Sequence, residues 1–360
     1  MNFPNPAGLN GFDFLEFTTP DPQKLINQFQ SMGFTAYAKH KKHDITIYRQ
    51  QEILFIINNT LNTRAQAFAK QHGASACAMG FRVNDATLAL QHALKQGAKL
   101  YQPDASKEAP AYEIPAIYGV GDSLIYFVDY QNNQPNYANE FNYLDGYSDE
   151  TSNENVGLTY IDHVTHNLHR GNMITWANFY TQLFNFREIR HFDIEGTMTG
   201  LKSKAMTSPC GKIRIPLNES SDNQSQIEEF LQDFNGEGIQ HIALGTNNIY
   251  DSVKSLQNRG LAFLDTPDTY YDLIEKRLPK HGEPLELMKQ HRILIDGDTK
   301  TTHKILLQIF TKNMLGPVFF EIIQRKGDEG FGEGNFRALF VSIELDQIQR
   351  GFLTPDKEMA

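Results

Sequence analysis

An internal repeat is the feature that most constrains how this chain can fold. Residues 78–97 align without a gap with residues 241–260. In each copy an apolar segment typical of a strand leads to an Asn or Asp at a helix N-cap, and the helix pattern that follows ends at Gly97 or Gly260. Two shorter matches pair residues 12–15 with 161–164 and residues 121–126 with 316–321. The chain is therefore expected to contain two copies of one structural unit.

Each copy is expected to be an α+β unit, in which a strongly curved sheet carries helices on its outer side. Short β-rich runs alternate with amphipathic helix patterns, and these runs lie at residues 11–17, 44–48, 53–57, 124–129, 160–164, 239–244, 304–311 and 318–324. Residues 131–155 are rich in Asn, Asp, Glu and Tyr, which is typical of a connection between domains. We therefore predict one domain at residues 1–150 and a second at residues 151–360.

Composition excludes several classes of protein. The chain has 33 Lys and Arg residues against 43 Asp and Glu residues, and the resulting net charge of −10 disfavours a nucleic-acid partner. The sequence contains no apolar run typical of a membrane span or a signal peptide, so we expect a soluble, cytoplasmic protein. Cys77 and Cys210 are the only cysteines, which fits a reducing compartment and excludes a Cys-based zinc site. A metal ion would have to be held by His and carboxylate side chains.

The repeat also exposes a candidate metal site. Three matched strand positions carry typical metal ligands in the second half: His163, His241 and Glu321. In the first half the same positions hold Phe14, Ala78 and Tyr126, so this half is expected to be metal-free. Two imidazoles and one carboxylate leave positions open for a chelating substrate and O2, as in non-haem Fe(II) oxygenases, but the same set also binds zinc. A carboxylate in the apolar strand around Glu321 would be costly to bury unless a cation offset its charge.

Several segments resemble the 4-hydroxyphenylpyruvate dioxygenase family, in the same order and over nearly the whole chain. Among them are GIQHIAL at residues 238–244, FEIIQR at 320–325 and GFGEGNF at 330–336, and the others lie at residues 11–17, 215–219, 225–227 and 306–311. The resemblance implies the vicinal-oxygen-chelate fold, with duplicated domains whose curved mixed sheets form open barrels. It also implies an Fe(II) cofactor and the conversion of 4-hydroxyphenylpyruvate and O2 to homogentisate and CO2, a step of tyrosine and phenylalanine catabolism. A homo-oligomer, either a dimer or a tetramer, is expected.

The resemblance assigns roles to individual residues of this chain. The family's metal ligands fall on the three positions already identified from the repeat. The expected catalytic residues are Ser203, Asn218, Gln226 and Gln240, and the expected substrate pocket consists of Pro216, Gln308, Phe310, Phe319, Phe331, Asn335 and Phe336. This mixture suits a phenol, because amide and hydroxyl groups can bind its oxygen while aromatic side chains flank its ring.

Some of these assignments leave alternatives. Gln240 directly precedes His241, so in a regular strand it would point to the opposite face, and either a bulge turns it inward or it belongs to a supporting shell. The alternative for Gln226 is a solvated helix residue. For three of the aromatic residues the alternative is the hydrophobic core: Phe310, Phe319 and Phe336.

The C-terminal segment and the reaction itself also leave alternatives. An apolar stripe predicts a helix that is either a lid hinged at glycines 330, 332 and 334 or a packed terminal helix, and its members are Phe336, Leu339, Phe340 and Ile343. Hydroxymandelate synthase, which acts on the same substrate, is the alternative enzyme. A binding role without catalysis is the other alternative, and the intact ligand set disfavours it.

Overall fold

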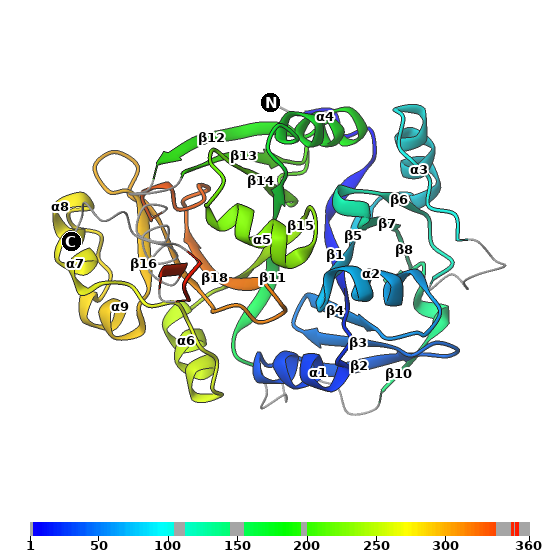
Figure 1. The fold of residues 1–360 in the computed structure, drawn as a ribbon, viewed down its shortest axis with the longest axis horizontal. Coiled ribbons are helices and arrows are strands. Elements are labelled where there is room, and N and C mark those ends of the chain that lie inside the picture. The colour runs from blue at the N-terminus through cyan, green and yellow to red at the C-terminus, as the bar shows by residue number, and fades with distance from the viewer. Residues whose placement is uncertain are drawn as a thin grey trace.

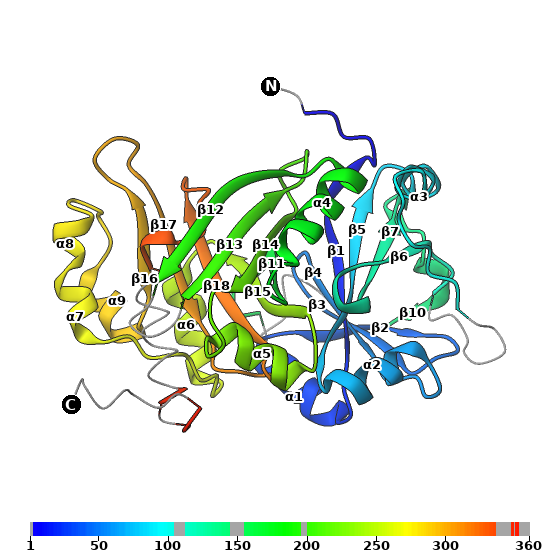
Figure 2. The ribbon, with the colours of Figure 1, turned by 45° about the horizontal axis from the view of Figure 1, so that its top comes forward.

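The computed structural model describes residues 3–103, 112–144, 155–195, 200–335, 347–348 and 350–352. The predicted C-terminal helix lies almost entirely outside these residues, and so does Phe336. Two eight-stranded mixed sheets form the molecule, the first from the N-terminal half and the second from the C-terminal half (Figure 1). Figure 2 shows the second sheet curled, with helices packed outside it. No helix in the described residues is long and apolar enough to cross a membrane.

The two sheets have equivalent strand orders. The first contains, from edge to edge, β10 (Phe141–Tyr143), β2 (Thr35–His40), β3 (Ile45–Gln50), β4 (Ile53–Asn58), β1 (Leu9–Thr18), β5 (Ser75–Val83), β7 (Leu124–Val128) and β6 (Ala116–Tyr118). The second contains β12 (Arg187–Glu195), β13 (Gly200–Thr207), β14 (Arg214–Ser220), β11 (Leu158–Leu168), β15 (Gly238–Thr246), β18 (Phe319–Lys326), β17 (Lys304–Phe310) and β16 (Leu294–Asp298).

Strand directions confirm the repeat. In the first sheet β1 is parallel to β4 and antiparallel to β5, and β5 is parallel to β7; β11, β14, β15 and β18 repeat this pattern in the second sheet. The register agrees as well, because Gly80 faces Tyr126 in the first sheet and Ala243 faces Glu321 in the second. Tyr126 and Glu321 therefore occupy equivalent positions, as the sequence alignment predicts.

Nine named α-helices lie within the described residues, and the repeat extends to them. They are α1 (Pro22–Ser31), α2 (Arg64–His72), α3 (Ala86–Lys95), α4 (Met173–Phe184), α5 (Gln226–Phe234), α6 (Ile249–Asn258), α7 (Asp268–Asp272), α8 (Ile274–Arg277) and α9 (Leu285–His291). The matched pair is α3 and α6, whose N-caps Asp85 and Asn248 each accept a backbone N–H bond. Gly97 and Gly260 follow these helices with φ of 95° and 84°, a conformation that favours glycine.

The segment predicted as a pure connection contains some regular structure. A small two-stranded sheet, β8 (Tyr130–Gln131) and β9 (Gln134–Pro135), lies there, and β10 extends the first sheet by pairing with β2. The prediction was wrong for these strands because edge strands are held by backbone hydrogen bonds and need no apolar run. Residues 145–154 of the segment lie outside the described part.

One continuous apolar core joins the two halves. The rings of Phe55 and Phe320 lie 5.9 Å apart across the boundary, and those of Phe81 and Phe184 lie 5.7 Å apart. A separate cluster fills the face of the first sheet that corresponds to the metal-site face of the second. Its members include Phe14, Ala78, Tyr112, Tyr126 and Tyr137.

Candidate metal centre

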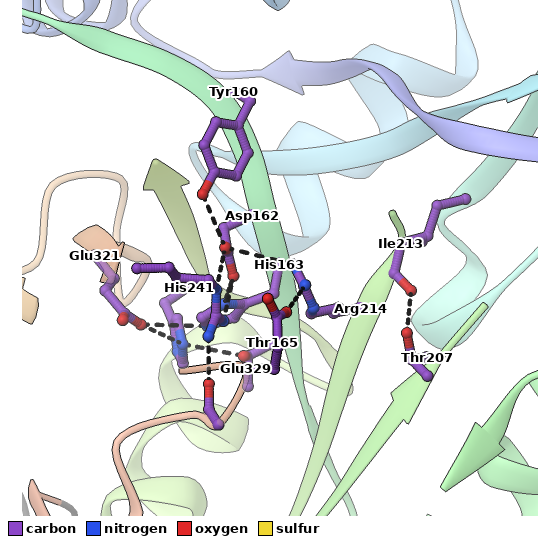
Figure 3. Close-up of polar contacts among 12 residues, drawn as sticks. Tyr160, Asp162, His163, Thr165, Thr207, Ile213, Arg214, His241, Glu321 and Glu329 are labelled. Carbon is purple, nitrogen blue, oxygen red and sulfur yellow. Dashed lines mark hydrogen bonds and ion pairs between the residues drawn. The ribbon is translucent and has the colours of Figure 1, made fainter. Parts of the chain in front are cut away.

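Three side chains from central strands of the second sheet meet on one face. His163 lies on β11, His241 on β15 and Glu321 on β18, and one ligand atom of each lies within 4.8 Å of the others. Glu321 Oε2 lies 3.2 Å from His163 Nε2 and 3.6 Å from His241 Nε2 (Figure 3). Within the described residues, this is the only group of three His, Cys, Asp or Glu side chains close enough to hold a metal ion.

A β-bulge brings the residue before His163 to its ring. Ile161 faces Leu244 and His163 faces Ala243, so Asp162 is an extra residue in β11. A bulge changes the direction of neighbouring side chains, and bulges are common beside active sites. Here it allows His163 Nδ1 to donate a hydrogen bond of 2.8 Å to Asp162 Oδ1.

A second bulge does the same for His241. Thr165 faces His241 and His166 faces Ile239, so Gln240 is an extra residue in β15. Its Oε1 lies 2.8 Å from His241 Nδ1 and accepts the proton that this nitrogen carries. Gln240 thus lies at a bulge and contacts the histidine from the side opposite Glu321.

The donor set fits a divalent cation. Since Nδ1 of both rings donates a proton elsewhere, each Nε2 presents a lone pair to the space beside Glu321. The Glu321 side chain is buried, and its Oε1 finds no hydrogen-bond partner among the described residues. A buried carboxylate with an unpartnered oxygen, facing two imidazole lone pairs, is the environment that a bound cation would stabilise.

The pKa values of the two histidines differ because their neighbours differ. Burial lowers the pKa of His241 well below its usual value, and the nearby His163 lowers it further. Burial alone would also lower the pKa of His163, but Glu321 and Asp162 outweigh it and raise that pKa. A cation that binds here would therefore compete with protonation of His163.

Asp162 supplies a fixed negative charge behind His163. Burial would raise the pKa of this carboxyl, but the bonds from Arg325 and His163 hold it far below its usual value. Arg214 Nη1 lies 3.5 Å from Asp162 Oδ2, and the Tyr160 hydroxyl lies at the same distance (Figure 3). The His163 ring is thus oriented by a carboxylate that stays ionised.

A cavity of about 60 Å³ opens beside the three candidate ligands. Five residues expected from the sequence line it: Ser203, Pro216, Asn218, Phe310 and Phe331. Ser203 faces Asn218 across β13 and β14, so a hydroxyl and an amide lie together. The aromatic side chains come from β17 and from the loop after β18.

The other expected residues within the described part of the chain do not line this cavity. Gln226, Gln240 and Phe319 line a neighbouring hollow, and the Phe319 ring stacks on His241 at 4.9 Å. Gln308 is buried on β17, and neither its Nε2 nor its Oε1 finds a partner among the described residues. Asn335 is buried, and its Oδ1 accepts hydrogen bonds from Tyr270 and Arg277.

Sequence reasoning gave no role to several residues of the site. Phe192 lines the cavity from the edge strand β12, in which charged residues alternate with apolar ones and which was not predicted from the sequence. The Thr165 hydroxyl lies 3.0 Å from His241 Nε2, and its place two residues after His163 was the available signal. Asp162 lies in a segment of the repeat alignment and Arg325 in a segment that carries the family resemblance, but their contacts depend on a strand register that the sequence does not show.

Two family models match the chain. The model of the glyoxalase, bleomycin resistance protein and dioxygenase superfamily matches residues 160–273, and the model of the N-terminal part of hydroxyphenylpyruvate dioxygenase matches residues 3–142. A solved mutant of 4-hydroxymandelate synthase from Streptomyces coelicolor is structurally similar, with a TM-score of 0.79 and 26% identity over 94% of this chain and 99% of that one. Fold and site thus define a vicinal-oxygen-chelate dioxygenase.

Curated relatives identify the family within this class. The 4-hydroxyphenylpyruvate dioxygenase of Legionella pneumophila (strain Corby) is 56% identical over 97% of this chain and 98% of its own length. The protein of the same name from Pseudomonas aeruginosa is 51% identical over 97% of each chain. This chain belongs to the 4-hydroxyphenylpyruvate dioxygenase family.

Proposed function

We propose that this enzyme converts 4-hydroxyphenylpyruvate and O2 to homogentisate and CO2, a step of tyrosine and phenylalanine catabolism, with Fe(II) held by His163, His241 and Glu321. The observation that carries the proposal is the convergence of these three side chains beside a cavity lined by hydroxyl, amide and aromatic groups. Bound Fe(II) would supply the redox chemistry for O2 and a chelation point for an α-keto acid. The full-length similarity to curated dioxygenases supports the same reaction.

The chain's own groups would bind and orient the substrate. Ser203 and Asn218, which face each other on neighbouring strands, offer a hydroxyl and an amide to a phenol oxygen. Phe310 and Phe331 would flank the aromatic ring and keep water from it. The unpartnered amide of Gln308 is a further group that a polar ligand would satisfy.

Gln226 and Gln240 act from the neighbouring hollow in this proposal. Gln240 holds the His241 ring, and Gln226 begins α5 on the far side of that hollow. Phe319 stacks on His241, Pro216 lines the cavity, and Asn335 is assigned to the pocket from the family's motif. We assign Phe336 to the same wall because it follows Asn335 in the family's motif.

We further propose that residues 336–360 form a lid on the catalytic domain. Support comes from the described part of this segment, in which Gln347 Nε2 donates a 2.8 Å hydrogen bond to Glu229 Oε2 and Arg350 forms an ion pair with the same carboxylate. Glu229 and Arg350 line the hollow that also contains Gln240. The segment therefore contacts the same hollow as Gln240, the residue that holds the candidate ligand His241.

The division of the chain into two domains is proposed from the repeat. We propose an N-terminal domain at residues 1–150 without a metal and a catalytic domain at residues 151–360. The two cysteines are unpaired thiols, which supports the reducing cytoplasm as the compartment. Assembly into a dimer or tetramer is part of the same proposal and can be measured by analytical ultracentrifugation.

Product identification tests the reaction. Iron-loaded protein incubated in air with 4-hydroxyphenylpyruvate should consume one O2 per substrate and release homogentisate and CO2. Hydroxymandelate as the main product would instead assign the chain the reaction of its structural relative.

Replacement of a ligand tests the site. Glu321→Ala should abolish turnover and lower the iron content of the purified protein, because it removes the only anionic ligand. Tyr126→Phe changes the equivalent position of the first half and should leave both unchanged. Normal turnover in folded Glu321→Ala would remove Glu321 from the ligand set.

A further inference from the structure

Arg325 shares a carboxylate with a metal ligand. Its side chain is 8% exposed, and it binds Asp162 through two parallel contacts, Nε to Oδ2 at 2.7 Å and Nη2 to Oδ1 at 2.8 Å. The same Oδ1 accepts the hydrogen bond from His163 Nδ1. Any shift of the carboxylate therefore moves both the imidazole and the guanidinium.

The other side of Arg325 holds the loop after β18. Nη1 donates to the carbonyl oxygens of Asp328 at 3.1 Å and Gly330 at 2.6 Å. The guanidinium carbon lies 5.7 Å from the centre of the Phe331 ring, which in turn lies 5.3 Å from the His163 ring. Phe331 lines the cavity. Arg325 therefore contacts both Asp162, which orients His163, and a residue of the cavity lining.

A second arginine repeats this connection on the same loop. Arg214 Nη1 lies 3.5 Å from Asp162 Oδ2, while its Nη2 forms an ion pair with Glu329. Residues 328–331 are thus tied to Asp162 by two cations that start from different strands. Both arginines that hold this loop also contact Asp162, which orients His163. A loop held only for stability would not need both of these arginines to contact that aspartate.

The first half shows what this aspartate does without a metal. Asp13 occupies the position equivalent to Asp162 and is also buried, but Phe14 follows it where His163 follows Asp162. Its partners are two tyrosine hydroxyls, from Tyr130 at 2.7 Å and Tyr137 at 2.8 Å, and a half-exposed arginine, Arg82, at 3.2 Å.

The comparison of the two halves separates the role of the buried aspartate from that of its arginine partner. If the alignment of β7 with β18 is continued, Tyr130 stands where Arg325 does. The buried aspartate is therefore a feature of the repeated fold, whereas the buried arginine with two contacts occurs where a histidine ligand and a cavity loop must be held together.

We propose that Arg325 is a positioning residue that couples metal binding at His163 to the order of residues 327–331, through Asp162. The inference rests on the metal centre of the proposed function. A metal that fixes the His163 ring also fixes Asp162 and hence Arg325, and Arg325 then holds the carbonyls of the loop and Phe331 against the cavity. Because coupling is reciprocal, loss of the loop contacts weakens metal binding as well.

Two readouts that need no turnover test this coupling. Co(II) alone is titrated into the chelator-treated protein and followed by its visible absorption, and hydrogen exchange of residues 327–335 is measured with and without Co(II). In the wild type, Co(II) should slow this exchange. In Arg325→Met the Co(II) affinity should fall about 10- to 100-fold, the usual effect of removing a group that supports a metal ligand, and the protection should disappear.

Matched variants separate coupling from loss of stability. Arg82→Met removes the arginine that binds Asp13 in the first half and should leave both readouts at wild-type values. Arg325→Lys, which keeps the charge but cannot make both contacts, should fall between Met and the wild type, and it replaces Arg325→Met if that variant does not fold.

Wild-type Co(II) affinity, or wild-type protection of the loop, in a folded Arg325 variant would overturn the inference. Failure of the wild type to bind Co(II) would contradict the metal centre itself and the inference with it. The two failures are thus distinguished by the wild-type titration alone.

Discussion

At the scale of single residues, each candidate histidine ligand depends on the residue that precedes it. Asp162 holds His163 and Gln240 holds His241, both at 2.8 Å and both from bulged positions. Strict alternation would point these side chains to the opposite face of the sheet. The sequence left the orientation of Gln240 open for this reason, because a bulge is a property of the pairing of two strands and leaves no mark in either strand alone.

The bond from Gln240 should be measurable in metal affinity. Gln240→Leu removes the acceptor for His241 Nδ1 and should weaken Fe(II) or Co(II) binding about tenfold or more. Gln240→Glu keeps an acceptor oxygen and should retain most of the affinity. Cys77→Ala alters the matched position of the first sheet and is the control. Equal affinities in Gln240→Leu and wild type, measured by titration, would assign the Gln240 contact no part in metal binding.

His166 should make stability depend on pH. It is fully buried, and burial lowers its pKa to about 3, although a backbone hydrogen bond at Val164 opposes the shift. An unfolded histidine takes up its proton near pH 6.5, so the unfolded chain binds more protons between pH 6.5 and 3. The contribution of His166 is therefore complete above pH 6.5 and is lost as the pH falls, by up to about 1.4 kcal/mol per pH unit.

A variant isolates this contribution. In His166→Phe the free energy of unfolding, measured in urea with chelator at pH 7.5, 6.0 and 5.0, should fall less steeply with pH than in the wild type. The other histidines are common to both proteins, and although His166 contributes to lowering the pKa of His241, most of their effect cancels in the difference. Identical slopes would show that His166 is protonated in the folded protein or that it finds a partner in water.

At the scale of elements, strands with continuous apolar runs were predictable, whereas the interior strands β13 and β14 and the edge strand β12 were not. The sequence predicts β11, β15, β17 and β18, because strands buried on both faces need continuous apolar runs. The edge strand β12 has the sequence REIRHFDIE, in which charged residues alternate with apolar ones. Backbone hydrogen bonds to the neighbouring strand β13 hold β12 in the sheet. The sequence of β12 alone does not show this pairing.

Helix α5 should anchor the C-terminal segment through one carboxylate. Glu229 is buried and binds both Gln347 and Arg350, so Glu229→Ala removes both contacts. If the segment is a lid, O2 consumption should exceed homogentisate formation in this variant, because the site is less protected from water. The measurement is the ratio of O2 consumed to product formed, with iron content as a check.

A neighbouring carboxylate provides the control. Glu228 on the same helix turn pairs only at the surface with Arg170, at 3.8 Å, and Glu228→Ala should keep the wild-type ratio. A fully coupled reaction in Glu229→Ala would favour the alternative of a packed terminal helix. Residues 336–346, where the predicted apolar stripe lies, are outside the described part of the chain.

At the scale of the whole molecule, the two halves share a fold and differ in what fills the matched positions. The repeat in the sequence was sufficient to predict the equivalent sheets and to select the three side chains that meet in the second one. The repeat was not sufficient to predict that a single apolar core crosses between the halves. The contacts across the boundary join elements that are not equivalent in the two halves, so the alignment of the halves does not show them. Phe81 against Phe184 is one such contact.

This division of roles predicts that stability and metal content respond separately to a change in the first half. Phe14 is fully buried at the position matching His163, and its ring lies 5.8 Å from Tyr126 and 5.7 Å from Tyr137. Phe14→Ala should therefore cost about 3–5 kcal/mol of unfolding free energy through the cavity it leaves. Iron analysis should still give one metal per chain, whereas His163→Ala should lower the metal content towards zero.

The single tryptophan reports whether the halves unfold together. Trp176 lies on α4 in the second half, so its fluorescence monitors the part of the molecule that Phe14 does not touch. Phe14 lies in the separate cluster of the first sheet, but other residues of that sheet belong to the core that crosses between the halves. Phe14→Ala should therefore shift the urea midpoint seen by Trp176 together with the midpoint seen by circular dichroism. If Trp176 kept the wild-type midpoint while circular dichroism showed an earlier transition, the halves would be independent folding units joined by a passive interface.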